Sequence, residues 1–210
     1  MNKIEQLKNT LTELATKDKK FTIFGSETHR YQLNPCFSEV EIKAVEAKNK
    51  ITLPDDYRRF LLEVGNGGAG PGYGLLELEV KEEGKKGNFL SQPFLLNKAW
   101  NYSEFLNPDE EFVDIDEDKL MQGTIYLANY GCGISACLVI TGYQRGKIWI
   151  DDRGNDGGIY PCSLQFAYLY HSNNFQIEDE DCDTALTFYD WYDNCLNSCL
   201  KDLSSEQNNS

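Results

Sequence analysis

The 210-residue sequence lacks several features that would place it in a membrane, outside the cell or in a familiar enzyme class. It has no run approaching the ~18 consecutive apolar residues of a membrane-spanning helix, and Glu5 lies where a secretory signal needs an apolar stretch. Neither GxSxG nor GKS/GKT occurs, and only two histidines are present to act as a general base. We therefore expect a cytoplasmic, noncatalytic protein without a cofactor.

Basic residues are scarce in the second half of the chain. Residues 1–98 hold 15 Lys and Arg against 14 Asp and Glu, whereas residues 99–210 hold 5 against 20. The net charge of −14 therefore arises in the C-terminal half. Negative charge repels nucleic acid and anionic membranes and attracts basic proteins, so we expect a basic protein partner. The alternative is that the acids only keep the protein soluble.

The seven cysteines have no repeated spacing, and no CxxC pair is present. Cys195 and Cys199 lie one helical turn apart, but His29 and His171 are the only imidazole ligands available to complete a zinc site. We expect reduced thiols packed in or near a core, in preference to a metal site.

Two clusters of acidic residues supply some of the carboxylates that a cation site needs. The first begins at Asp114 and resembles the start of a calcium loop, but Lys119 and Ile125 replace the glycine and glutamate that such a loop needs. The second, Asp151, Asp152 and Asp156, is more typical of residues that cap turns. We therefore predict solvated acidic loops and no metal.

Residues 53–74, LPDDYRRFLLEVGNGGAGPGYG, predict a short helix followed by a glycine-rich turn. Pro54 suits the first helical position, and Gly65 suits a left-handed residue that ends the helix. Residues 75–80 then alternate leucine or valine with glutamate, which predicts a strand with one buried face. The glycines also match the pattern GxGxxG. In a dinucleotide-binding protein that loop follows a strand and begins a helix, whereas here it follows a helix and precedes a strand. Nucleotide binding is therefore a remote alternative.

The remaining pattern predicts an α+β fold with a central antiparallel sheet, flanked by N-terminal helices and a C-terminal helix. Residues 4–14 have helical periodicity, and Ser38 with Glu41 forms a capping-box pattern. Glycine-containing turns separate sequential strands between residues 124 and 161, of which the middle one, residues 136–140, is apolar enough to be covered on both faces. We expect one domain over residues 1–203, closed by a helix from about residue 184, and a disordered polar tail over residues 204–210.

The order and spacing of the motifs resemble the SUKH superfamily, which includes fungal cell-wall-assembly regulators and bacterial immunity proteins of polymorphic toxin systems. The matching positions are Leu53, Pro54, Tyr57, Phe60, Leu61, Asn66, Gly67, Gly68, Pro93, Phe94, Trp100, Asn101, GCG at 131–133, LVITG at 138–142, RGKIWID at 145–151, Asp156, Gly157, Gly158, Ile159, Pro161 and FYDWY at 188–192. The resemblance implies a protein that binds a cognate toxin domain in the producing bacterial cell and covers its active site. The alternative that it implies is a regulatory scaffold similar to the fungal members.

Aromatic residues among carboxylates suit a protein interface, because the rings contribute burial and the acids pair with Lys or Arg of the partner. Core packing is the default for Trp149 and Trp191, whereas Trp100 is a candidate for a partly exposed contact surface. We therefore predict a basic, nuclease-like toxin as partner, with no nucleic acid or membrane, and an oligomeric state that the sequence leaves open. The predicted contact residues are Trp100, Tyr102, Asp114, Asp116, Glu117, Asp118, Asp151, Asp152, Glu178, Asp179 and Asp181.

Overall fold

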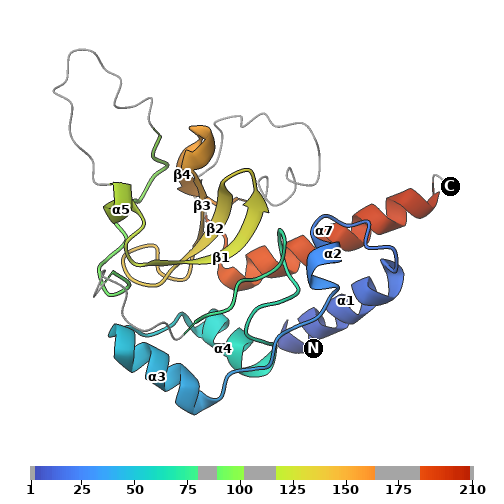
Figure 1. The fold of residues 1–210 in the computed structure, drawn as a ribbon, viewed down its shortest axis with the longest axis horizontal. Coiled ribbons are helices and arrows are strands. Elements are labelled where there is room, and N and C mark those ends of the chain that lie inside the picture. Colours follow the sequence, from blue (N-terminus) through green and yellow to red (C-terminus); the bar gives the residue numbers. More distant parts are fainter. Residues whose placement is uncertain (1–2, 80–88, 102–116, 164–184, 209–210) are drawn as a thin grey trace.

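A computed structural model describes residues 3–79, 89–101, 117–163 and 185–208, with side chains at all of these except 117, 118 and 206–208. Within them, a four-stranded antiparallel sheet in the order β1-β2-β3-β4 forms the centre (Figure 1). The strands are β1 (Thr124–Gly131), β2 (Ile134–Val139), β3 (Ile148–Asp152) and β4 (Gly158–Pro161). The predicted α+β class with sequential antiparallel strands is confirmed.

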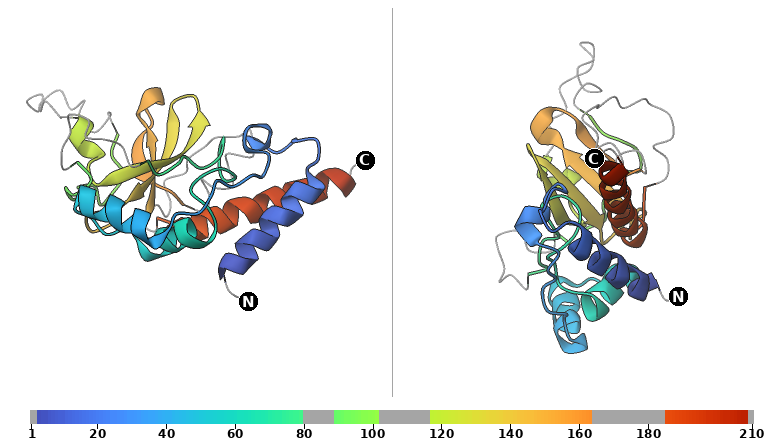
Figure 2. Two further views of the ribbon diagram at one scale, coloured as in Figure 1. Left: turned by 60° about the horizontal axis from the view of Figure 1, so that its bottom comes forward. Right: turned by 90° about the vertical axis from the view of Figure 1, so that its right-hand side faces the viewer.

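The helices lie before and after the sheet in the sequence. They are α1 (Lys3–Lys17), α2 (Ser26–His29), α3 (Glu39–Asn49), α4 (Asp55–Glu63), α5 (Glu117–Leu120) and α7 (Phe188–Asn208), with a short 3₁₀ turn η2 (Arg153–Asn155) between β3 and β4. Helix α7 packs against α1 and α4, so the two ends of the chain meet on one side of the sheet (Figure 2). The predicted arrangement of N-terminal helices and a C-terminal helix around the sheet is therefore confirmed.

Strand β2 is buried on both faces, as its apolar sequence predicts. Ala136 and Leu138 belong to a large core shared with α1, α4 and α7, whereas Cys137 and Val139 belong to a second core on the opposite face. The alternation follows from the pleat of a strand, which points successive side chains to opposite faces. Trp149 and Trp191 are fully buried, so the prediction of core packing for both is confirmed.

Side chains at the helix ends satisfy backbone groups that the helices leave without partners. The capping box at Ser38 and Glu41 is present as predicted, with each side chain accepting a hydrogen bond from the other residue's backbone N–H. At the start of α7, the Asp56 carboxylate accepts from the Tyr189 N–H at 3.2 Å. Asp56 thus joins the N-terminal end of α4 to the start of α7. The partial positive charge of a helix N-terminus also stabilises the negative charge of Asp56.

The glycine-rich turn follows α4 as predicted, but the prediction that Gly65 ends the helix in a left-handed conformation is wrong. Positive φ angles begin instead at Gly67 (87°) and Gly68 (97°), where L side chains are strained. Gly65 is needed for space, because a Cβ there would lie 2.7 Å from the carbonyl oxygen of Asn34. The glycines therefore let two backbone segments approach closely.

Two predictions of local structure are wrong, one of a strand and one of a disordered tail. Residues 75–79 are extended but form no strand, and Leu76 is exposed where the alternation predicted burial. Residues 204–208, predicted as disordered, continue α7, where the hydroxyl groups of Ser204 and Ser205 donate to the carbonyl oxygens of Leu200 and Asp202.

Candidate functional site, a groove beside the outer strand

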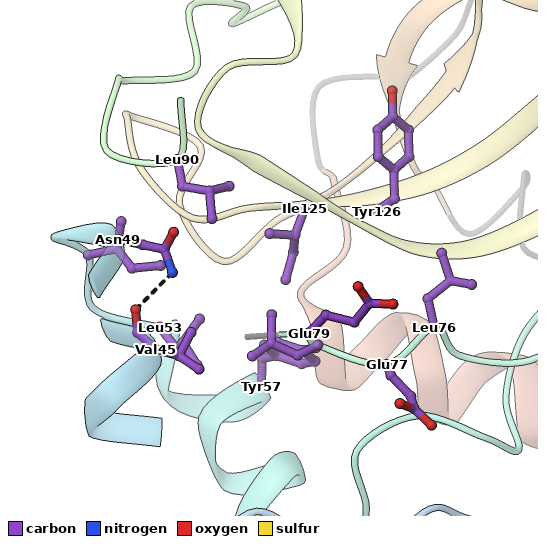
Figure 3. Close-up of a pocket in the computed structure, with 12 residues that line it drawn as sticks. Val45, Asn49, Leu53, Tyr57, Leu76, Glu77, Glu79, Leu90, Ile125 and Tyr126 are labelled. Atoms are coloured by element: carbon purple, nitrogen blue, oxygen red, sulfur yellow. Dashed lines mark hydrogen bonds between the residues drawn. The ribbon is translucent and has the colours of Figure 1, made fainter. Parts of the chain in front are cut away.

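A groove of about 440 Å³ opens between α3, the extended residues 75–79 and β1 (Figure 3). Volumes of this size are typical of sites that hold a small ligand or a few side chains. Its apolar lining comes from elements far apart in the sequence: Val45, Ile51, Leu53, Tyr57, Leu76, Leu78, Leu90, Ile125 and Tyr126. Asn49, Glu77 and Glu79 are the polar members of the described lining.

The groove exists because residues 75–79 leave the sheet after a short contact. Leu76 N donates to Leu127 O of β1 at 2.7 Å, but Leu78 N donates to Asn66 Oδ1 at 2.8 Å. The Asn66 amide also donates to Leu78 O, at 3.4 Å, so its side chain takes the place of a partner strand. Leu78 and Ile125 both line the groove.

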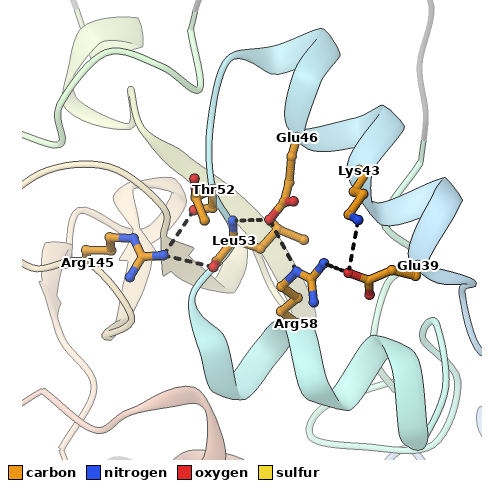
Figure 4. Close-up of polar contacts among 7 residues, drawn as sticks. All are labelled: Glu39, Lys43, Glu46, Thr52, Leu53, Arg58 and Arg145. Carbon is orange, nitrogen blue, oxygen red and sulfur yellow. Dashed lines mark hydrogen bonds and ion pairs between the residues drawn. The ribbon is translucent and has the colours of Figure 1, made fainter.

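A polar network holds the turn between α3 and α4, at the groove's inner wall (Figure 4). Arg58 of α4 contacts Glu39 and Glu46 of α3, through Nη2 at 2.5 Å and Nε at 3.5 Å. Glu46 in turn accepts from the Leu53 N–H at 2.9 Å. The network fixes two adjacent helices and the backbone of Leu53.

Arg145, from the turn between β2 and β3, attaches the sheet to the same wall. Its Nη2 donates to Thr52 O at 3.1 Å and to Leu53 O at 2.8 Å (Figure 4). Both Arg145 and Leu53 belong to motifs that carry the family resemblance. Their contact joins these two motifs and so sets the position of α3 and α4 relative to the sheet.

The charged residues that line the described groove are both acidic. Figure 3 shows the Glu79 carboxylate turned toward the space below β1, whereas the Glu77 carboxylate points away from it. Asn34 Nδ2 donates to Glu77 Oε1 at 2.8 Å and so fixes that side chain. Among its described charged residues, the groove therefore has one carboxylate, that of Glu79, turned toward its apolar walls.

A second polar cluster joins β1 to β3 and to the η2 turn that follows β3. Asp151 is 7% exposed, and its carboxylate accepts two hydrogen bonds from Arg153 and one from the Tyr126 hydroxyl, each at 2.8 Å. Burial alone would raise the pKa of Asp151, but the hydrogen bonds from Arg153 and Tyr126 hold that pKa below its ordinary value. Asp151 is thus an ionised, internally paired carboxylate that orients Tyr126.

Three predicted contact residues have described side chains, and all three are buried. Trp100 is 6% exposed, because its backbone pairs with Ile159 of β4 and its ring belongs to the second core. The expectation of a partly exposed Trp100 is therefore wrong. Asp152 is also buried and accepts from Asn155 Nδ2 at 2.7 Å, while Asp151 is paired with Arg153.

The other predicted contacts lie outside the described residues or have side chains outside them. Tyr102, Asp114, Asp116, Glu178, Asp179 and Asp181 are in the first group, and Glu117 and Asp118 of α5 are in the second. Their role in binding stays a prediction. The groove itself has no signal in the sequence, because an alternating Leu–Glu pattern indicates a paired strand and gives no sign that the Asn66 side chain binds the Leu78 backbone.

The chemistry of the described side chains favours packing over catalysis. Burial raises the pKa of the Cys137 and Cys162 thiols, which keeps them protonated and poorly nucleophilic. The six described cysteines are free, and burial lowers the pKa of His29, whose Nδ1 accepts from the Tyr31 N–H. Over the described ranges, no three His, Cys, Asp or Glu side chains are placed to hold a metal ion.

The fold and groove define a small α+β protein built around an antiparallel sheet. The sequence model of the SMI1 / KNR4 family (SUKH-1) matches residues 36–170, more than half of the chain, so the protein belongs to this family within the SUKH superfamily. Neither the curated proteins nor the solved structures contain a match. In the described part of the chain, no helix has the length and apolar content to cross a membrane. Family membership fits an immunity protein or an SMI1-like regulator.

Proposed function

We propose that this chain is a noncatalytic immunity protein, which binds a cognate toxin domain in the producing bacterial cell and covers its active site. The observation that carries the proposal is the groove, whose walls are apolar and whose charged lining residues, among those described, are Glu77 and Glu79. Such a surface suits a protein partner, because apolar contacts supply affinity and rim charges supply selectivity. Membership of the SMI1 / KNR4 family fits this role, as it also fits an SMI1-like regulator.

The partner that we propose is a basic toxin domain, such as a nuclease whose surface binds phosphate. The charge balance of residues 99–210, 5 basic against 20 acidic, supports this choice. Opposite charges raise the rate of encounter by long-range attraction. We propose that acids outside the described side chains contribute to that attraction: Asp114, Asp116, Glu117, Asp118, Glu178, Asp179 and Asp181.

A toxicity-rescue assay tests the proposal. A reading frame beside the one for this chain would encode a large secreted protein with a variable C-terminal domain, and that domain is expressed with and without this chain. Restored growth supports immunity. Growth that stays arrested, with both proteins present in soluble form, contradicts it and leaves the SMI1-like regulatory role as the better account of the family match.

A further inference from the structure

His29, the last residue of α2, lies half-buried where α2 meets α1, α7 and the glycine-rich turn (Figure 1). It lines a small cavity together with Leu11 and Leu14 of α1 and Leu196 of α7. The ring also lies against the turn, because a Cβ added at Gly74 would be 3.4 Å from His29 Cδ2. The imidazole of His29 therefore contributes to the packing of α2 against the glycine-rich turn.

The backbone that follows α2 is strained, and His29 stabilises it through a hydrogen bond. Arg30 and Tyr31 have φ angles of 48° and 59°, in the left-handed region that residues with a Cβ rarely adopt. The Tyr31 N–H donates to His29 Nδ1 at 3.0 Å, and the two rings pack edge to face with their centroids 5.3 Å apart. The Tyr31 hydroxyl donates to Asp18 at 2.6 Å. His29 and Asp18 thus bind Tyr31 at its backbone and at the end of its side chain.

The hydrogen bond from Tyr31 depends on the protonation state of His29. Nδ1 accepts a hydrogen bond only while it carries no proton, so the neutral ring has its proton on Nε2. A second proton would make Nδ1 a donor and would set its N–H against the N–H of Tyr31. Protonation therefore replaces an attraction with a repulsion at the strained residues.

Two opposing effects act on the charge of the His29 ring. Burial disfavours the imidazolium form, whereas the Asp18 carboxylate, just after α1, favours it. Burial is the larger effect, so the pKa of His29 lies below its ordinary value of about 6.5. The other titratable groups beside His29 in the described part of the chain are Tyr31, Cys195 and Cys199, which line the same cavity, and the exposed Glu27 and Arg30.

We propose that His29 is a pH-sensitive switch, in which proton binding at Nδ1 breaks the hydrogen bond from Tyr31 and releases α2 and the strained residues 30–31 from the glycine-rich turn. The released conformation exposes the ring to water and so binds the proton more tightly than the closed one. The same turn continues into residues 75–79, which border the groove. The inference concerns the fold of this chain alone, so it does not depend on the proposed immunity function.

The sign of the pH dependence follows from the lowered pKa. Above about pH 6.5 the ring is neutral in both conformations, and pH does not change their ratio. As the pH falls further, the released conformation takes up the proton first, and its population rises by up to about tenfold per pH unit. The rise ends when the ring of the closed conformation is protonated as well. Asp18 does not contribute in this range, since its pKa lies below the ordinary aspartate value.

Amide hydrogen exchange of the ¹⁵N-labelled full chain, measured between about pH 7.5 and about pH 5 and divided by the intrinsic rate at each pH, tests the switch. We expect the opening of the Tyr31 amide to increase at least about fivefold toward the lower pH, and to exceed that of Leu138 in the core strand β2 at least about tenfold there. Constant opening of Tyr31 overturns the inference. Equal opening of Tyr31 and Leu138 also overturns it, because the whole molecule would then unfold together.

Two matched substitutions assign the effect to one ring. His29→Asn places an amide oxygen close to the position of Nδ1, so it keeps an acceptor for the Tyr31 N–H but does not titrate. In this variant we expect the opening of Tyr31 to change less than about twofold over the same pH range. His171→Asn, at the other histidine of the sequence, is the control and should preserve the wild-type increase. An increase that persists in His29→Asn, or that disappears in His171→Asn, overturns the assignment.

The control variant also decides the question if His29→Asn does not fold. In His171→Asn the remaining histidine is His29, so the Cε1–H resonance of its ring reports its titration directly. We expect a midpoint below about pH 6.5 and an opening of Tyr31 that follows the protonation of this ring. A midpoint at or above about pH 6.5, or an opening that does not follow the titration, overturns the inference.

Discussion

At the scale of single residues, Asp18 organises the N-terminal part of the chain. It is 2% exposed and accepts hydrogen bonds from the Thr22 and Ile23 backbone N–H groups and from the Thr22, Ser26 and Tyr31 hydroxyl groups. Burial opposes ionisation, but the hydrogen bonds, led by that from Tyr31, lower the pKa of Asp18 below its ordinary value. A single carboxylate thus joins the end of α1 to the turn before α2 and to Tyr31.

Asp18→Asn is expected to lower the free energy of unfolding by about 3 kcal/mol at pH 7, since hydrogen bonds to a charged acceptor are worth more than those to a neutral one. Because the folded pKa is depressed, the stabilisation is complete above the ordinary aspartate pKa of about 4 and is lost as the pH falls through the folded value. The gap between wild type and variant should therefore shrink below about pH 4.

Urea unfolding at a series of pH values measures this gap. Asp156→Asn is the control, because Asp156 is exposed and has φ 59°, a conformation that asparagine tolerates well. A gap between wild type and Asp18→Asn that stays constant from pH 7 to pH 3 would contradict the assignment of Asp18 as the ionised acceptor.

The buried acids show what sequence can and cannot indicate about single residues. A run of carboxylates indicates the sign of the local charge, but it does not show which of them are paired inside the fold. Arg153, two residues after Asp151, was the available signal that this acid is neutralised locally. For Trp100 no comparable signal existed, since its burial depends on pairing with Ile159, far away in the sequence.

At the scale of elements, the glycine-rich turn joins α4 to the extended residues 75–79. Gly68 pairs with Leu75 on one side and lies against Gln32 and Leu33 on the other. A Cβ at Gly68 would lie 2.4 Å from the Gln32 carbonyl oxygen, and the residue has φ 97°. Gly68 is therefore required for two reasons: its positive φ strains L side chains, and there is no space for a Cβ.

Two glycine-to-alanine substitutions separate these needs. Gly68→Ala is expected to lower the free energy of unfolding by more than about 3 kcal/mol, because it adds a backbone clash to an unfavourable φ. Gly146→Ala, at φ 84° with its nearest Cβ neighbour 3.7 Å away on Pro54, is expected to cost only about 1 kcal/mol. Chemical denaturation compares them, and equal losses would contradict the packing argument.

Arg145 offers a test of the link between the sheet and the α3–α4 turn. Arg145→Met is expected to cost about 1 to 2 kcal/mol, because it removes two charge-assisted hydrogen bonds to the carbonyl oxygens of Thr52 and Leu53. Arg59→Met is the matched control, since the pair that Arg59 makes with Glu63 is exposed and its loss should cost less than about 0.5 kcal/mol. Similar thermal midpoints for the two variants would contradict the link.

Most elements could be predicted from local pattern, and the exceptions have physical causes. The amphipathic α1, the capping box of α3 and the apolar β2 are set by their own residues, and each was predicted correctly. Residues 75–79 were not, because their conformation depends on the Asn66 side chain rather than on their own alternation. β4 also has little signal of its own, being four residues with a glycine and a proline.

At the scale of the whole molecule, the protein combines a rigid fold with a strongly uneven charge. Helices α1, α4 and α7 support one face of the sheet, and the groove opens beside β1 where the described lining is apolar with two glutamates. The net charge of −14 adds an attraction that reaches about a Debye length, near 8 Å at physiological salt. Short-range fit and long-range charge thus make separate contributions to binding.

The measurement that tests the account most directly is stopped-flow binding of the purified full chain to the toxic domain, at about 0.02 M and about 0.5 M salt. We predict a stable complex whose association rate falls at least about tenfold at the higher salt, while its dissociation rate changes much less. Absence of a complex at micromolar concentrations, or an association rate that does not depend on salt, would contradict capture of a basic toxin by this acidic protein.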